Sequence, residues 1–348
     1  MLTSSKPQFY RVTPAFNWFE LEVGPSIEQV NGPRHRLYGE QAGNPEGVPV
    51  ICLHGGPGAG SNPATRQFFD PDYYRVIQFD QRGAGKSTPH AEMRHNDTPS
   101  LVDDISRVAD HLGLKRFILF GGSWGSTLAL AYAQAHPQRV AAMVLRGIFL
   151  GRQKDLDWFT SGARQLMPEA HDTLIAHIGL GPDAAPGIIL DRYYDALMNP
   201  DSAVHGPAAK VWSQYEDALA SVEPGQARKQ AKERFERLRR GESVAATSTG
   251  KSTSQFQLAI ARAEAHYMKH LMFLPPQGLL AHVDRIVHIP AFLVHGRYDC
   301  VCTLEGAAEL ARHWPIAQLD VIENAGHSTF DAGIANALLD RMEQMKRM

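Results

Sequence analysis

The stretch that decides the fold is Phe117-Ile-Leu-Phe-Gly121-Gly-Ser123-Trp-Gly125-Ser-Thr-Leu-Ala-Leu130. Its first four residues are apolar and predict a buried strand, and residues 126–136 are rich in Ala and Leu and predict a helix that ends before Pro137. Between them lies the pattern Gly-x-Ser-x-Gly. A strand, a sharp turn and a helix in this order hold the serine hydroxyl above the sheet, and the flanking glycines let strand and helix approach closely. The sequence therefore predicts Ser123 as a nucleophile.

Short apolar runs on both sides of this turn predict the other strands of the sheet. Each run ends at a loop signal such as Gly, Pro or Asp, and amphipathic segments with helical spacing lie between the runs. This alternation is typical of a mostly parallel sheet with helices on both faces. The predicted strands are 50–53, 75–79, 117–120, 142–145, 291–294 and 319–322, and the predicted helices are 101–112, 126–136 and 332 to the C-terminus.

The alternation lapses between residues 151 and 282, where the sequence predicts helices and no strand. Within this region, the basic run and polar loop of 226–255 mix Lys and Arg with Glu, which is typical of a solvated surface. The nucleophile turn and the interrupted sheet together predict the α/β-hydrolase fold. Its core domain would consist of residues 1–150 and 283–348, and residues 151–282 would form an inserted helical cap domain.

An acid and a base for Ser123 are predicted by chain order and position. A serine hydroxyl needs a neighbouring imidazole to remove its proton, and in this fold the partners follow in the order Ser, Asp or Glu, His. Asp299 comes just after the strand 291–294 and is the predicted acid, and His327 comes after the strand 319–322 and is the predicted base. Cys302 lies three residues beyond the acid and is therefore expected near the substrate pocket.

Two backbone N–H groups are expected to stabilise the oxyanion. One belongs to Trp124, the residue after the nucleophile, and the other to Gly56 in His54-Gly-Gly-Pro-Gly58, which follows the strand 50–53. The loop Asp80-Gln-Arg-Gly-Ala-Gly-Lys-Ser87 lacks the full spacing of a phosphate-binding loop, so we predict a structural role for it.

The composition favours a small-molecule substrate. A formal net charge of −2 gives no electrostatic reason to bind nucleic acid or an anionic membrane. The three cysteines, Cys52, Cys300 and Cys302, are odd in number and lack the spacing of a metal site, so neither a disulfide framework nor a bound metal is expected. Free thiols and an N-terminus without an apolar leader predict a cytoplasmic protein.

Four motifs together resemble the prolyl aminopeptidases, also called proline iminopeptidases, of the α/β-hydrolase superfamily. They are His54-Gly-Gly-Pro-Gly58, Asp80-Gln-Arg-Gly-x-Gly-x-Ser87, Gly121-Gly-Ser-Trp-Gly-Ser-Thr-Leu-Ala-Leu130 and His295-Gly-Arg-Tyr-Asp299. The resemblance implies a helical cap, hydrolysis of small peptides with an N-terminal proline through an acyl-enzyme, and no cofactor. It also implies that Glu216 and Glu264 hold the substrate ammonium and that Phe149 and Phe159 line the proline pocket.

Two alternatives remain open at the level of the sequence. Tyr215 and Met268 stand where the family is expected to have Trp and Phe, which keeps a broader aminoacyl amide or ester hydrolase on the same triad as the first alternative. The second is a non-catalytic binding module, although such a protein need not retain Ser123, Asp299 and His327 together. The sequence carries no signal for an oligomeric state.

Overall fold

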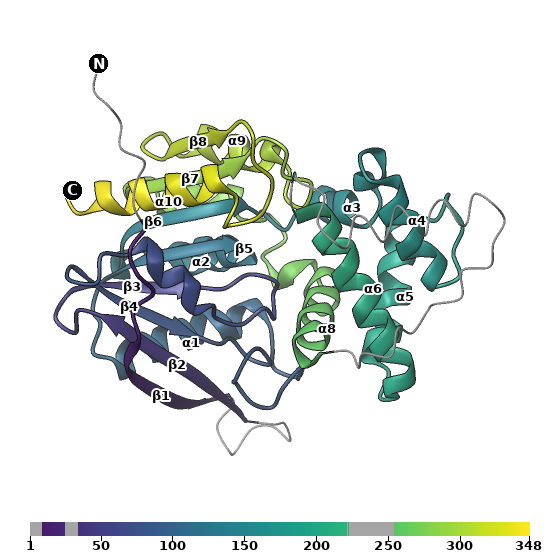
Figure 1. The fold of residues 1–348 in the computed structure, drawn as a ribbon, viewed down its shortest axis with the longest axis horizontal. Helices are drawn as coiled ribbons and strands as arrows, with labels where there is room; N and C mark the ends of the chain where they lie inside the picture. The colour runs from purple at the N-terminus through teal and green to yellow at the C-terminus, as the bar shows by residue number, and fades with distance from the viewer. Residues whose placement is uncertain (1–8, 25–33, 221, 223–253) are drawn as a thin grey trace.

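The protein is built on one eight-stranded sheet with the strand order β1-β2-β4-β3-β5-β6-β7-β8 (Figure 1). A computed structural model describes residues 9–24, 34–220, 222 and 254–348. From β3 onward, neighbouring strands are parallel. The strands are β1 Ala15–Val23, β2 His35–Gly43, β3 Val48–Leu53, β4 Tyr74–Phe79, β5 Phe117–Ser123, β6 Val140–Ile148, β7 Ala291–Gly296 and β8 Gln318–Ile322. The predicted mostly parallel sheet is confirmed.

The first two strands were not predicted, and they are antiparallel. β1 pairs with β2, and β2 pairs with β4. β1 is the edge strand, most of its side chains are exposed, and only Phe19 and Val23 are buried. Its polar residues therefore hide the apolar alternation by which a strand is recognised in a sequence.

Alternate residues of the central strands enter two separate apolar layers. In β3, Val50 and Cys52 pack in the layer of α10, whereas Ile51 and Leu53 pack in the layer of α1 and α2. Strands buried on both faces are expected in a parallel sheet that is covered by helices on both sides. These helices are α1 Thr98–His111, α2 Trp124–Ala135, α9 Leu304–His313 and α10 Ala332–Met345, with the short helix η1 Pro63–Phe68 near α10.

The chain leaves the sheet after β6 and returns to it at β7. Between these strands lie α3 Gln153–Thr160, α4 Pro168–His177, α5 Pro186–Met198, α6 Ser202–Ala220 and α8 Gln255–Lys269, which form a separate helical layer beside the sheet (Figure 1). Of the basic segment 226–255, residues 226–253 lie outside the described residues. Across the described ranges, no helix is both long and apolar enough to cross a membrane.

Candidate active site

Ser123 lies at the junction of β5 and α2 with φ 56° and ψ −128°. A positive φ is unfavourable for a side-chain-bearing residue and is found where the surrounding structure enforces it. The flanking glycines allow the close approach: a Cβ at Gly121 would lie 2.4 Å from the carbonyl oxygen of Gly125, and a Cβ at Gly125 would lie 2.2 Å from that of Leu53. The junction therefore requires glycine at both positions.

Two hydroxyls that follow the junction fix the next strand. The Ser126 hydroxyl donates to the Ser123 carbonyl (2.7 Å) and accepts from the Phe149 N–H (3.1 Å). The Thr127 hydroxyl donates to the Phe149 carbonyl (2.6 Å). The chain just after β6 is therefore hydrogen-bonded to the nucleophile helix through both the N–H and the carbonyl of Phe149.

Asp299 and His327 are joined by a short hydrogen bond. His327 Nδ1 donates to Asp299 Oδ2 at 2.7 Å, and Asp299 Oδ1 accepts from the backbone N–H groups of Val301 (3.0 Å) and Cys302 (2.8 Å). Burial alone would raise the pKa of Asp299, but the charge and hydrogen bond of His327 lower it overall. The carboxylate is therefore ionised and oriented toward the imidazole.

The other ring nitrogen of His327 faces a guanidinium. Arg146 Nη1 lies 3.3 Å from His327 Nε2 and donates to the His327 carbonyl at 2.9 Å. A guanidinium can only donate, so Nε2 carries the lone pair and Nδ1 carries the proton. This is the tautomer that a base for Ser123 needs. Within the described residues no hydrogen bond joins Ser123 Oγ to Nε2, and such catalytic bonds are often long without substrate.

His54 and His295, which chain order excludes as the base, use both of their ring nitrogens elsewhere. His54 Nδ1 donates to the Gly55 carbonyl, and His54 Nε2 accepts from the backbone N–H of Gln81 (3.0 Å). His295 Nδ1 accepts from the Ile148 N–H (3.0 Å), and His295 Nε2 donates to the Cys302 carbonyl (2.8 Å). Neither imidazole has a free lone pair for Ser123.

The loop after β3 passes close to both the nucleophile and the helical layer. A Cβ at Gly55 would lie 3.3 Å from Ser123 Cβ, and Gly56 has a φ of 100°. A Cβ at Gly58 would lie 2.6 Å from the carbonyl oxygen of Ala259 in α8. The glycines therefore let the backbone approach the place where a substrate carbonyl would bind.

Gln81 connects this loop to the nucleophile helix, and sequence reasoning did not single it out. Its side-chain NH₂ donates to the His54 carbonyl (3.0 Å), and its side-chain oxygen accepts from the Trp124 indole N–H (2.9 Å). Its neighbour Asp80 accepts from the backbone N–H groups of Ser61 (2.6 Å) and Lys86 (2.7 Å). These bonds confirm the structural role predicted for the loop 80–87.

Glu216 on α6 and Glu264 on α8 have interacting carboxyl groups. Glu264 is only 2% exposed, and its Oε2 accepts from the Trp212 indole N–H at 2.5 Å. Burial raises the pKa of both carboxyls, and Glu216 raises that of Glu264 further. Two interacting carboxyls, of which Glu264 is buried and Glu216 is half-buried, favour the state in which they share a proton.

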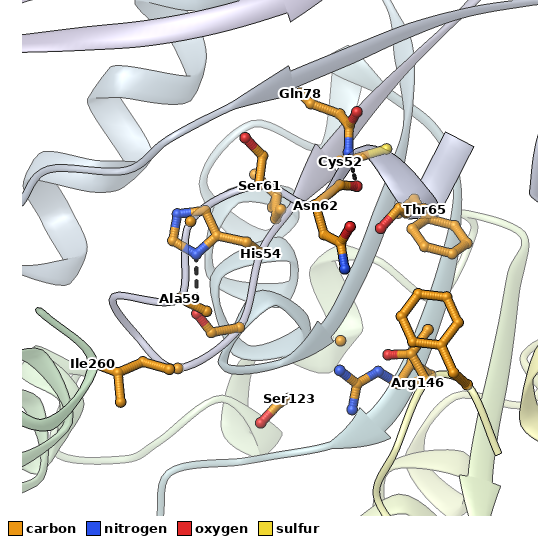
Figure 2. A pocket seen from close by; sticks show the side chains of 18 of the residues that line it. Cys52, His54, Ala59, Ser61, Asn62, Thr65, Gln78, Ser123, Arg146 and Ile260 are labelled. Carbon is orange, nitrogen blue, oxygen red and sulfur yellow. Dashed lines mark hydrogen bonds between the residues drawn. The ribbon is translucent and has the colours of Figure 1, made fainter. Parts of the chain in front are cut away.

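One cavity of ≈250 Å³ brings four of the predicted residues together, namely Ser123, His327, Gly56 and Glu216 (Figure 2). The other six predicted residues are not among the described residues that line it: Asp299, Trp124, Glu264, Phe149, Phe159 and Cys302.

These six residues are all buried. The ring of Phe159 packs against Trp212 and Tyr215, with ring centroids 5.5 and 5.4 Å apart. The Cys302 thiol is buried, and burial raises its pKa. In the ranges that the structure covers, no group of three or more His, Cys, Asp or Glu side chains could hold a metal ion.

The family model described as "alpha/beta hydrolase fold" matches residues 48–333. Proline iminopeptidase of Xylella fastidiosa is 43% identical over 307 residues, which cover 88% of this chain and 91% of the relative. Proline iminopeptidase of Neisseria gonorrhoeae is 40% identical, with 89% and 93% covered, and that of Arabidopsis thaliana is 42% identical, with 90% and 78% covered. The chain belongs to the proline iminopeptidase family. The resemblance drawn from the four motifs of this family is therefore confirmed.

Solved structures outside the proline iminopeptidase family have the same fold at low sequence identity. An esterase from Exiguobacterium antarcticum is 20% identical with a TM-score of 0.57, covering 90% of this chain and 96% of its own. A thermophilic esterase from Thermogutta terrifontis is 19% identical with a TM-score of 0.55, covering 94% and 98%. These likenesses support the fold of the family and carry no information about substrate.

Proposed function

We propose that the protein is a serine exopeptidase that releases an N-terminal proline from small peptides. The observation that carries this proposal is that Glu216 lines the same cavity as Ser123 and His327, with Glu264 in contact behind it. A pair of carboxyls beside a nucleophile suits a substrate that presents an ammonium next to the bond to be cleaved. The relatives named proline iminopeptidase support the same assignment.

In this mechanism His327 Nε2 removes the proton from Ser123 as Oγ attacks the prolyl carbonyl carbon. The C–N bond to the next residue then breaks, and His327 gives its proton to the leaving nitrogen. Water, deprotonated by the same imidazole, attacks the prolyl ester and releases proline and the free serine. Asp299 holds the imidazole in the required tautomer and stabilises its charged form.

The tetrahedral oxyanion would accept from the backbone N–H groups of Gly56 and Trp124. Trp124 begins α2, so its N–H has no partner within the helix and points outward from the helix N-terminus. Loss of one such donor costs roughly 2.7–4 kcal/mol of barrier. The Gln81 side chain is hydrogen-bonded to the His54 carbonyl and to the Trp124 indole, so it would keep the two backbone donors at a fixed separation.

The glutamate pair would select for a free amino terminus. A secondary ammonium that leaves water needs compensating charge, and charge-assisted hydrogen bonds are the strong kind. Binding would favour the ionised form of both carboxyls, so the proton that they share in the free enzyme would leave. A substrate with a blocked nitrogen would leave the pair without its partner.

The test is to compare proline arylamide, acetyl-proline arylamide and a small uncharged ester. We expect acetylation to reduce kcat/KM by more than tenfold. Glu216→Gln and Glu264→Gln should each reduce kcat/KM for proline arylamide by about tenfold, which corresponds to about 1.4 kcal/mol, and should affect the ester much less. Equal losses on ester and arylamide would contradict an ammonium-binding role.

A broader aminoacyl amide or ester hydrolase is the second candidate, because Phe149 and Phe159 lie outside the cavity lining among the described residues. Comparable turnover of proline, alanine and leucine arylamides would favour it. Fluorophosphonate labelling that disappears in Ser123→Ala excludes a non-catalytic module. We also propose that residues 151–282 act as a cap domain and that the three free cysteines place the protein in the cytoplasm.

A further inference from the structure

The cavity continues beyond Ser123, away from the helical layer, to an open end near the start of η1. Its lining there includes Asn62, Thr65, Gln78, Thr329 and Phe330. Asn62 and Phe330 are exposed, so this end is in contact with solvent. Figure 2 shows the Asn62 amide and the Arg146 guanidinium projecting into this part of the cavity.

The chemistry places the leaving group at this end. His327 delivers its proton to the leaving nitrogen, so the residue after proline must lie on the side of the imidazole. Thr329 and Phe330 follow His327 by two and three residues and continue the lining on that side. Glu216 is reserved, in the proposed function, for the amino terminus. The open end is therefore the exit side of the scissile bond.

Two side chains at this end, Arg146 and Asn62, keep N–H groups that have no acceptor among the described residues. Arg146 uses Nη1 on the His327 carbonyl, and in the described part of the chain no carboxylate lies within salt-bridge distance of its guanidinium. A Cβ at Gly122 would lie 2.3 Å from Arg146 Nε, so the side chain lies directly across the backbone next to the nucleophile. The cation is therefore held beside the scissile bond.

Asn62 is oriented by its own backbone. Its side-chain oxygen accepts from the Ala64 N–H (2.9 Å) and caps η1, which leaves the NH₂ group to face the cavity. Its carbonyl accepts from the side chain of Gln78 (2.8 Å), whose oxygen accepts from Arg66 Nε (2.7 Å). The loop position of Asn62 is thus fixed by buried partners, although its amide is exposed.

We propose that Arg146 and Asn62 form a binding site for the terminal carboxylate of a dipeptide, so that the enzyme prefers Pro-X dipeptides to longer or amidated substrates. This inference rests on the proposed function and specifies its leaving side. Glu216 and Arg146 both line this cavity and match the two charges of a dipeptide zwitterion.

The first test compares Pro-Gly with Pro-Gly amide and Pro-Gly-Gly on the wild-type enzyme. We expect kcat/KM for Pro-Gly to exceed that for Pro-Gly amide by about fivefold, because charge-assisted hydrogen bonds are stronger than neutral ones while solvent at this open end limits the gain. Pro-Gly-Gly should resemble the amide, since its carboxylate lies one residue further out. Equal values for Pro-Gly and its amide would overturn the proposal, whereas failure to cleave proline arylamide would overturn the proposed function instead.

The second test uses Asn62→Asp with Asn62→Ser as its matched control. Both replacements keep an oxygen that can cap η1, but only the aspartate puts a negative charge beside the substrate carboxylate. We expect the ratio of Pro-Gly to Pro-Gly amide to fall to one or below in Asn62→Asp and to fall less in Asn62→Ser. The ratio is measured within each variant, so a loss of folded protein cancels. An unchanged ratio in Asn62→Asp would overturn the role of Asn62.

Discussion

Replacement of Gln81 by leucine should slow the chemical step without weakening substrate binding. The Gln81 side chain joins the loop that carries Gly56 to the helix that begins at Trp124, through bonds of 3.0 and 2.9 Å. Leucine is similar in size but can make neither bond. The backbone bond from the Gln81 N–H to His54 Nε2 (3.0 Å) remains, so the loop loses only part of its support.

The expected magnitudes follow from the two bonds that are lost. Gln81→Leu leaves the His54 carbonyl and the fully buried Trp124 indole N–H without partners, at a cost of about 1–3 kcal/mol each in the free energy of unfolding. The effect on kcat is bounded by the loss of one oxyanion donor, about 10²–10³-fold. Since one loop bond remains, we expect kcat to fall by about tenfold to a hundredfold. KM should change little, because the oxyanion exists only in the transition state.

The assay is steady-state hydrolysis of proline arylamide, together with the Tm of each variant. Gln134→Leu is the matched control, because Gln134 is also buried and its side-chain NH₂ also donates to a backbone carbonyl, that of Leu279, at 2.8 Å. Gln134 is not among the described residues that line the cavity. The control should lose stability and keep its kcat. If Gln81→Leu loses Tm in step with the control and retains wild-type kcat, Gln81 is merely structural.

Three further predictions concern the glutamate pair, the triad and the buried thiol. Burial raises the pKa of Glu264, and the proton that the two glutamates share must leave before the ammonium binds. The value of kcat/KM for proline arylamide should therefore rise with pH more steeply than the value for a neutral ester. Glu264→Gln should remove this difference between the two substrates. Gly147→Ala should lower kcat more than tenfold, because the new Cβ would lie 3.0 Å from His327 Cε1. Gly113→Ala is the control: Gly113 also has a positive φ, but its surroundings are open, so this variant should lose only stability. Measurements of kcat and Tm on both variants check the prediction. Burial also raises the pKa of the Cys302 thiol, so alkylation of this thiol should be slow, should speed up at high pH and should be slowed by substrate. If Cys302→Ala is inhibited by the alkylating reagent as fully as the wild type, the inhibition comes from another thiol.

The parts of the fold that the sequence predicts are those dictated by local chemistry. The Ser123 turn, the buried parallel strands and the helix from Ala332 each follow from residue type and spacing within a short window. β1 was missed because an edge strand with one solvated face carries Trp18 and charged residues where a buried strand carries valine or isoleucine. Its pairing with β2 is visible only in three dimensions.

The same limit applies to the candidate site. Ser123, Asp299 and His327 could be selected by chain order, whereas Gln81, Arg146 and Asn62 have no spacing that marks them. Their interest comes from contacts with residues tens of positions away: Arg146 reaches His327 across 181 positions, and Gln81 reaches Trp124 across 43. Glu216 and Glu264 required the family resemblance, because a glutamate on a helix is usually solvated.

The helical layer touches the catalytic loops through main chain. The Ala220 carbonyl at the end of α6 accepts from the backbone N–H groups of His327 (2.8 Å) and Ser328 (3.0 Å). Any amino acid at position 220 can supply that carbonyl, so a substitution there keeps both hydrogen bonds, whereas a change in the length of α6 does not. Glu216 lies four residues before Ala220, and deletion of one residue between them would turn the carboxylate by about 100° around the helix axis. Recombination between relatives must therefore preserve the number of residues between Glu216 and Ala220, whatever side chains it exchanges at the surface of this layer.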